Sequence, residues 1–293
     1  MEPDYIKIRQ IKPLISAYIR KAQVLLKKSE FPDEGTIHDI RVFMKKSRAL
    51  LELLQGQADD PYYMRNMEDL RMVGRILCIS RDVSVYRKTL KEMKKEHPSI
   101  FKGLEDNSKL KSLMEKRAAA SEISGEMKSG IAEIQDILNK VLFRIRFQPV
   151  SSLDPHVLLR NLESSFSVVS DRYLRCRNKT KPRSLHRFRK GAKGFLYKLY
   201  VFRSLNPVTI KSVEKKLVSL TLNLGKYNDL DQILKTLDYR YVKGENHPSL
   251  DELVIKIREK QDRYLAKVWS AAYMVFCPGQ KLVNLLGYKI LVI

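Results

Sequence analysis

The stretch that decides the fold of this chain reads Ile37-His38-Asp39-Ile40-Arg41-Val42-Phe43-Met44-Lys45, and a later stretch reads Leu185-His186-Arg187-Phe188-Arg189-Lys190-Gly191-Ala192-Lys193. Both follow the pattern apolar-His-x-apolar-Arg-x-x-x-Lys, and their histidines, at positions 38 and 186, are 148 residues apart. Apolar residues at three- and four-residue spacing are typical of a helix that buries one face. Each stretch is therefore predicted to lie in a helix with one apolar and one basic face.

A second pair of segments repeats at nearly the same offset. Leu77-Cys78-Ile79-Ser80-Arg81-Asp82 pairs with Leu224-Gly225-Lys226-Tyr227-Asn228-Asp229, and the last residues of the two segments are 147 positions apart. Two landmarks at one offset predict a duplicated unit. We predict an N-terminal repeat over 1–149 and a C-terminal repeat over 150–293, each a helical bundle, packed about a pseudo-two-fold axis.

The same helical spacing continues along almost the whole chain. Glycine and proline are scarce, at 12 and 11 residues, and strand-like alternation of apolar and polar residues is nearly absent. The fold is therefore predicted to be all-α. Helices are expected at 4–29, 37–56, 61–79, 82–96, 108–147, 153–178, 185–204, 208–225, 228–241 and 248–275.

The charge balance points to an anionic partner. The chain has 56 Lys and Arg against 33 Asp and Glu, a net charge of +23, while 44% of its residues are hydrophobic. This composition predicts a folded protein whose charge lies on its surface, suited to nucleic acid, an anionic membrane surface, acidic protein or polyphosphate. No run of about 18 apolar residues predicts a membrane span, and charges over residues 1–9 disfavour a signal peptide. With 3 dispersed cysteines, we expect a soluble protein of the reducing cytoplasm.

The basic faces of the two helices carry the candidate binding residues. At about 100° per residue, those of the first helix fall within an arc of roughly 80°. The first basic stripe comprises His38, Arg41, Lys45 and Arg48, and the second comprises His186, Arg189, Lys190, Lys193 and Tyr197. Like charges at these spacings repel, so an anion is expected to compensate them. Caps at Thr36 and Ser184 would place both histidines in a first turn, where backbone N–H groups favour phosphate.

Plainer explanations exist for each of these features. A single charged helix face is most often only a solvated face, and a single histidine is most often a hydrogen-bonded structural residue. We expect the structural role for His97, His156 and His247. For the two motif histidines, ligand contact and support of the binding surface remain open. The duplication of the stripe is what favours a binding function.

The duplicated His-x-x-Arg-x-x-x-Lys helix, with Arg81-Asp82-Val83 and Asn228-Asp229-Leu230-Asp231, resembles the CHAD family, the conserved-histidine α-helical domain. The likeness spans nearly the whole chain. The resemblance implies two helical bundles flanking a basic central cavity, binding of inorganic polyphosphate, and localisation at polyphosphate granules.

The resemblance also implies a set of polyphosphate-binding residues. Carried over by position, this set comprises His38, Arg41, Lys45, Lys46 and Arg48 in the first repeat and His186, Arg189, Lys193 and Tyr197 in the second. Gly194 and Leu196 stand where family members often have basic residues, and Lys190 and Lys198 add charge nearby. The resemblance therefore implies weaker ligand contact in the second repeat.

Binding is expected rather than catalysis. Metal-assisted phosphoryl chemistry needs clustered carboxylates or a glycine-rich phosphate loop, and the sequence contains neither. The field of the surrounding Arg and Lys disfavours a metal at either motif histidine, and no cofactor is expected. Nucleic-acid binding through backbone phosphates is the alternative, although no base-reading motif is present. A polyphosphate-processing enzyme ranks below both.

Overall fold

The computed structural model describes residues 10–28, 32–57, 60–77, 82–105, 123–147, 153–237 and 248–287, within which every secondary-structure element is a helix. The predicted all-α fold is confirmed. The helices are α1 (Ile11–Lys27), α2 (Glu34–Leu53), α3 (Asp60–Ile76), α4 (Asp82–Glu96), α5 (Pro98–Lys102), α7 (Ile123–Phe147), α8 (Pro155–Asn178), α9 (Pro182–Leu199), the 3₁₀ turn η2 (Tyr200–Phe202), α10 (Pro207–Thr236), α11 (Pro248–Phe276) and α12 (Leu282–Leu286).

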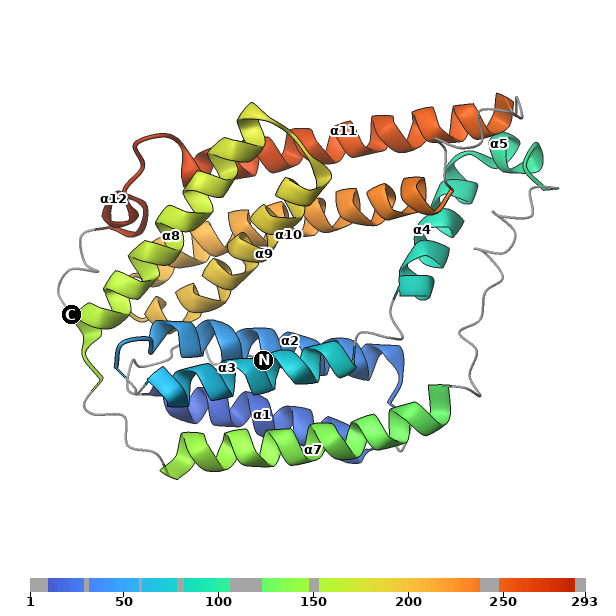
Figure 1. Cartoon of the computed structure of the whole chain (residues 1–293). Coiled ribbons are helices and arrows are strands. Elements are labelled where there is room, and N and C mark those ends of the chain that lie inside the picture. The colour runs from blue at the N-terminus through green and yellow to red at the C-terminus, as the bar shows by residue number, and fades with distance from the viewer. Residues whose placement is uncertain are drawn as a thin grey trace.

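The helices form two layers that meet at α2 and α9 (Figure 1). In the lower layer of that view α1 packs against α2 and α7, and α3 also packs against α2 and α7. In the upper layer α9 lies between α8 and α10, and α10 runs beside α11. Because α2 also packs against α8 and α9, the two helices that carry the repeated motif are direct neighbours.

The apolar faces predicted for these two helices form the core. Ile40, Met44 and Leu51 of α2 are at most 1% exposed, and Phe188 and Phe195 of α9 are fully buried. The rings of Phe188 and Phe195 meet that of Phe276, which α11 contributes, with centroids 5.9 and 6.3 Å apart. Phe43 of α2 is only half-buried, and its ring stacks on that of Tyr18 of α1 with centroids 5.9 Å apart. Burial of one face leaves the opposite, basic face of each helix pointing away from the core.

A smaller core joins the early helices α4 and α5 to the late helices α10 and α11. Leu90 and Met93 of α4 and Phe101 of α5 pack with a set of side chains from α10 and α11. These partners are Leu230, Ile233, Leu237, Leu250, Leu253 and Ile257. An ion pair between Lys260 and Glu96, at 2.7 Å, closes the edge of this cluster. These contacts cross the predicted boundary at 149, and the division into repeats stays a prediction.

One predicted break in the chain is wrong. The helices expected at 208–225 and 228–241 are joined in the single helix α10, which passes through Gly225 without interruption and ends at Thr236, while residues 238–241 lie outside the described residues. A Cβ at Gly225 would lie 2.9 Å from a guanidinium nitrogen of Arg189. The absence of a side chain at Gly225 therefore permits the close approach of Arg189 from α9. The sequence had instead suggested that a helix ends at this glycine. Of the helix predicted at 108–147, residues 123–147 are described and are helical.

Candidate functional site

The structure places all eleven candidate residues on α2 and α9. Their exposure differs along each stripe. His38 and Lys190 are exposed, Tyr197 and Lys198 are 5% exposed, and the half-buried members are Arg41, Lys45, Lys46, Arg48, His186, Arg189 and Lys193. In α9 the candidate residues become almost completely buried at Tyr197 and Lys198, whereas those of α2 are exposed or half-buried throughout.

The predicted caps at Thr36 and Ser184 are wrong. Both helices begin earlier in the sequence, so each motif histidine lies further from its helix start than predicted. The cap of α2 is Asp33, whose carboxylate accepts a hydrogen bond from the Thr36 backbone N–H at 2.7 Å. Helix α9 begins at Pro182, after Lys181. Both motif histidines therefore follow the first main-chain helical hydrogen bonds, Ile37 to Asp33 at 2.9 Å and Leu185 to Lys181 at 3.0 Å. An anion on the unbonded N–H groups of either helix start would lie before the histidine.

The motif arginines make parallel contacts with the backbone. Arg41 donates from a terminal guanidinium nitrogen to the carbonyl oxygen of Leu77 at 2.9 Å. Arg189 donates from Nε to the carbonyl oxygen of Thr221 at 3.1 Å. Leu77 opens the first landmark and Thr221 lies one turn before the second, so each arginine ties its helix to the corresponding landmark. These contacts give both arginines a structural role beside any contact with a ligand.

The surroundings of His186 favour the neutral form of its imidazole. Burial lowers the pKa of its imidazole, and the charges of Lys190, Arg189 and Lys235 lower it further. A hydrogen bond with the side chain of Asn228, from the second landmark, opposes this shift. The contact identifies one function of the landmark, which is to connect α10 to the histidine of α9.

Lys198 lies inside the body of the protein. Its Nζ is 2.7 Å from a carboxylate oxygen of Glu52 on α2 and donates to the Ser165 hydroxyl of α8 at 3.0 Å. Side-chain exposure is 7% for the lysine and 40% for the glutamate. This placement indicates a link between helices and does not favour the predicted ligand contact.

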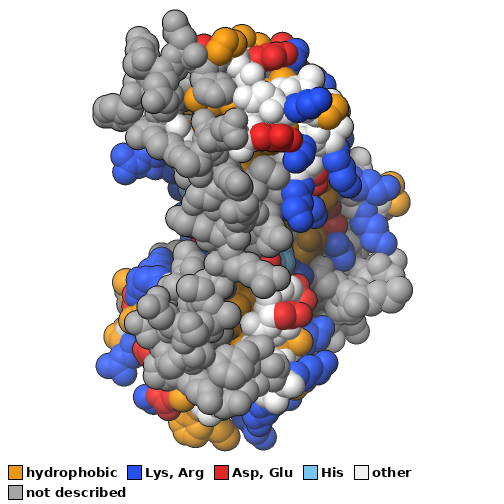
Figure 2. All heavy atoms as spheres, turned by 90° about the vertical axis from the view of Figure 1, so that its right-hand side faces the viewer, with side chains coloured by type: hydrophobic (Ala, Val, Ile, Leu, Met, Phe, Trp, Pro, Cys, Tyr) orange, Lys and Arg blue, Asp and Glu red, His pale blue; other side chains and the backbone are white. Residues whose placement is uncertain are grey.

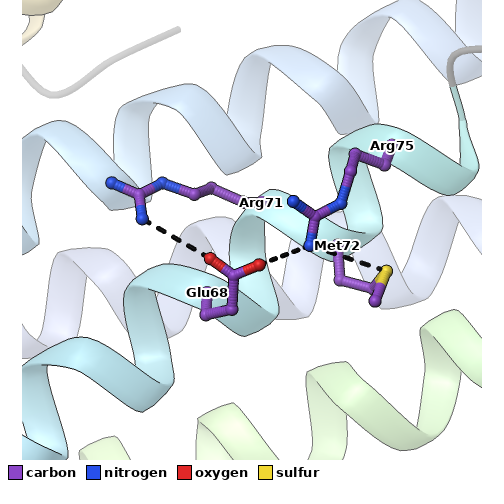
Figure 3. A network of polar contacts seen from close by, with 4 residues as sticks. All are labelled: Glu68, Arg71, Met72 and Arg75. Carbon is purple, nitrogen blue, oxygen red and sulfur yellow. Dashed lines mark hydrogen bonds and ion pairs between the residues drawn. The ribbon is translucent and has the colours of Figure 1, made fainter.

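Arg48 lies among charges of both signs. Burial lowers the pKa of its guanidinium, Glu52 raises it and Arg71 of α3 lowers it again. Arg71 itself donates to Glu68 at 3.5 Å, and Arg75 also bonds to that carboxylate, as Figure 3 shows. One exposed carboxylate thus pairs with two arginines of α3, and one of these, Arg71, lies near the Arg48 end of the first stripe.

Lysines of the two motif helices meet at the ring of Tyr197. The Nζ of Lys193, one turn earlier on α9, lies 5.9 Å from the ring centroid. The Nζ of Lys46, from α2, lies 5.8 Å from the same centroid. An ammonium within about 6 Å of a ring is attracted to its electron-rich face. The structure therefore brings a lysine from each motif helix to one tyrosine.

Parts of the predicted landmarks lie outside the described residues. These are residues 78–81, including Arg81, while Asp82 is the first residue of α4. Asp229 is half-buried in α10. Within the described ranges no group of three or more His, Cys, Asp or Glu side chains is placed to hold a metal ion. Over the same residues, no helix is long and apolar enough to cross a bilayer.

Basic side chains gather around the middle of the molecule. Figure 2 shows the side that carries α4 and α5, where the outline narrows between an upper and a lower part. Lys and Arg side chains border this narrowing on both parts.

Comparisons with known proteins agree with this arrangement. A family model described as CHAD domain matches residues 15–238. Among solved structures, the crystal structure of the CHAD domain from the plant Ricinus communis matches with a TM-score of 0.55 and 18% sequence identity. The match covers 99% of this chain and 93% of that one, and at such identity it shows a common fold. No curated protein matches the chain.

Proposed function

The chain belongs to the CHAD domain family, and from this premise we propose that it binds inorganic polyphosphate through the basic side chains of α2 and α9. The observation that carries the proposal is the direct packing of these two helices, which brings lysines from both motif copies to Tyr197. A linear polyanion that contacts both helices would lie in a basic cavity between the two repeats. Binding of this kind would also bring the protein to polyphosphate granules in a cytoplasm.

Electrostatics supports a polymer of phosphates as the ligand. Lysines and arginines three and four residues apart on one helix face repel each other, which costs about 0.2–0.5 kcal/mol per pair. Contact with phosphates removes this repulsion and releases the counterions condensed on the polymer. Arginine suits bidentate contact with a phosphate and lysine supplies a point charge, so a mixed stripe can follow a repeating anion.

A competition experiment tests the choice of ligand. Long-chain polyphosphate, duplex DNA and RNA are compared at equal phosphate concentration and near-physiological salt, with the full chain immobilised or labelled. We expect polyphosphate to displace both nucleic acids. If either nucleic acid displaces polyphosphate instead, the protein is a nucleic-acid-binding protein and the proposal is wrong.

Charge-reversal variants test the location of the site. Lys45→Glu with Lys190→Glu changes one residue in each stripe, and we expect polyphosphate affinity to fall by about tenfold or more. The matched control is Lys140→Glu with Arg146→Glu, which makes the same charge change at exposed positions of α7. This control should change affinity by about threefold at most. Equal losses from the two pairs would mean that only net charge matters, and the proposed site would be wrong.

We propose binding without turnover. The basic side chains of α2 and α9 can position phosphates, but neither helix offers a carboxylate cluster or a glycine-rich phosphate loop. Purified protein incubated with polyphosphate or ATP, with and without Mg²⁺ or Mn²⁺, should release no phosphate above a buffer blank. Release that persists through repurification and scales with protein concentration would show an enzyme.

A further inference from the structure

Two phenylalanines are exposed at the end of α7. Phe143 and Phe147 lie one turn apart, are 64% and 61% exposed, and have ring centroids separated by 4.8 Å. Every other phenylalanine among the described residues is buried or half-buried. Each exposed ring forgoes the stabilisation that burial gives, so an adjacent exposed pair indicates a surface that meets an apolar partner.

The two rings point away from the core of the protein. The opposite side of α7 is fully buried, through Ile134, Leu138 and Val141. Helix α7 packs against α1 and α3, and it lies at the edge of the lower layer that faces away from α9 (Figure 1). The exposed pair therefore belongs to a side of the molecule that the motif helices do not form.

Cations flank the rings on α7. The guanidinium carbon of Arg146 lies 5.3 Å from the ring centroid of Phe147. Lys140, one turn before the first ring, is exposed and pairs with Asp136 at 2.6 Å. The apolar stems of such side chains can lie along an apolar surface while their charged ends reach polar groups.

The neighbouring helix α1 adds further cations to this side. Gln23 of α1 donates a hydrogen bond to Asn139 of α7 at 2.8 Å, which joins the outer edges of the two helices. The next residue, Val24, is 55% exposed, and the exposed side chains of Arg20 and Lys27 lie one turn to either side of it. Helix α1 contains no Asp or Glu. We call these exposed side chains the α1–α7 face: Arg20, Val24, Lys27, Lys140, Phe143, Arg146 and Phe147.

An anionic lipid surface matches this face in both charge and polarity. A phosphate backbone attracts the cations but offers no apolar environment for the two rings. A second copy of the chain would bring like charges together. An acidic protein would need a pocket for the protruding rings, whereas a fluid bilayer accepts them without one. Cations that contact acidic headgroups beside inserted phenylalanines are typical of proteins that lie on a membrane surface.

We propose that the α1–α7 face docks on the surface of a bilayer that contains acidic lipids. Phe143 and Phe147 enter the boundary between headgroups and acyl chains, and Arg20, Lys27 and Arg146 contact the headgroups. This peripheral contact needs no spanning helix. It uses none of the side chains assigned to polyphosphate, so it goes beyond the proposed function and does not rest on it.

Vesicle flotation with the full chain tests the role of the rings. The parent should bind vesicles of phosphatidylcholine with phosphatidylserine at least about tenfold more tightly than vesicles of phosphatidylcholine alone. Phe143→Ser with Phe147→Ser should weaken binding to the acidic vesicles by about tenfold or more. The matched control is Val218→Ser with Leu222→Ser, an exposed pair one turn apart on α10, which should bind within about twofold of the parent. A parent that does not bind acidic vesicles, or equal losses from the two pairs, would overturn the proposal.

Charge reversal tests the role of the cations. Arg20→Glu with Lys27→Glu should weaken binding to the acidic vesicles by about twentyfold or more. Lys215→Glu with Lys267→Glu makes the same charge change at exposed positions of α10 and α11, and it should cost about threefold at most. Equal losses would show an effect of net charge alone, and the assigned face would be wrong.

Fluorescence quenching tests insertion directly. In vesicles whose acyl chains carry bromine, Phe143→Trp should be quenched more strongly than the parent, whose Trp269 is half-buried on α11. No additional quenching would mean that the ring stays outside the acyl chains and would contradict the docking geometry.

Two further ligands separate this surface from other functions. Phe143→Ser with Phe147→Ser should bind long-chain polyphosphate within about twofold of the parent, so failure of vesicle docking would leave the proposed function standing. Single-stranded RNA is the second ligand, because its bases can stack on exposed rings. If the same variant loses affinity for RNA but not for acidic vesicles, the α1–α7 face is a nucleic-acid surface and the docking proposal is wrong.

Discussion

The Nζ of Lys198 lies 2.7 Å from a carboxylate oxygen of Glu52, and this ion pair joins α9 to α2 beneath the basic face. The lysine is almost completely buried, and its Nζ also donates a hydrogen bond to the Ser165 hydroxyl. Among the predicted binding residues it is the one that the structure assigns most clearly to the connection between the motif helices.

Replacement of Lys198 is expected to destabilise the fold. Lys198→Met keeps the length of the side chain but leaves the partly buried Glu52 without its ion pair, which should lower the free energy of unfolding by about 1–3 kcal/mol. The exposed Lys190 provides the control, and Lys190→Met should change stability by about 0.5 kcal/mol or less. Urea denaturation followed by circular dichroism measures both. Equal stability of the Lys198→Met variant and the parent would contradict a structural role.

A methyl group at Gly225 is expected to disturb Arg189 without harming α10. Alanine gains up to about 1 kcal/mol of helix propensity over glycine, but its Cβ would lie 2.9 Å from the guanidinium, which must then move. Gly225→Ala should therefore stay folded and lose polyphosphate affinity by about three- to tenfold. The control Gly194→Ala lies on α9, where a Cβ meets no atom within 4 Å, and it should bind as the parent does. Identical affinities of the two variants would show that Arg189 does not need its present position.

The depressed pKa of His186 predicts a pH dependence of stability. Because the pKa in the folded protein is below the ordinary value of 6.5, the unfolded chain binds the proton more readily. The stability contributed by the neutral imidazole is therefore present above about pH 6.5 and is lost as pH falls through that value towards the folded pKa. His186→Gln should flatten the stability profile between about pH 5 and 7, measured by urea denaturation. His156→Gln, at an exposed position of α8, should leave the profile as steep as the parent's.

Removal of the Glu68 charge is expected to strengthen polyphosphate binding. This exposed carboxylate pairs with Arg71 and Arg75, so Glu68→Gln would remove the charge that compensates both arginines, of which Arg71 lies near enough to Arg48 to lower its pKa. We expect affinity to rise by about two- to threefold at low salt and the gain to vanish at high salt, where surface charges are screened. Asp136→Asn removes the same charge next to Lys140 on α7 and serves as the control. An equal gain from both variants would show an effect of net charge alone.

The sequence predicted the motif helices and their faces correctly because apolar periodicity reports directly which side of a helix is buried. Ile40 and Phe188 are both fully buried, as their spacing required. Periodicity does not say which helix covers a face, so it could not show that Lys198 meets Glu52. Neither could it show that Tyr18 of α1 and Tyr200 reach Lys46, since those contacts join separate elements.

The errors at helix ends have a related cause. Thr36 and Ser184 are good capping residues, but Asp33 and Pro182 stand earlier and begin their helices first. At Gly225 the sequence signal for a break was overridden by packing, because α10 lies between α9 and α11 and gains burial along its whole length. The three-residue offset of Tyr200 from Tyr197 was a local signal that could have indicated a shared aromatic cluster.

The smaller core between α4–α5 and α10–α11 has a consequence for biosynthesis. Leu90, Met93 and Phe101 pack in one cluster with side chains from residues 230–257, which leave the ribosome more than a hundred residues later. During translation these apolar side chains therefore stay exposed until residues 230–257 have been synthesised. Exposed apolar surface can associate with other chains. Late closure of α10 and α11 over α4 and α5 would then be the step that commits the polypeptide to its final shape, and a nascent chain stalled before that point would be a natural target for chaperones.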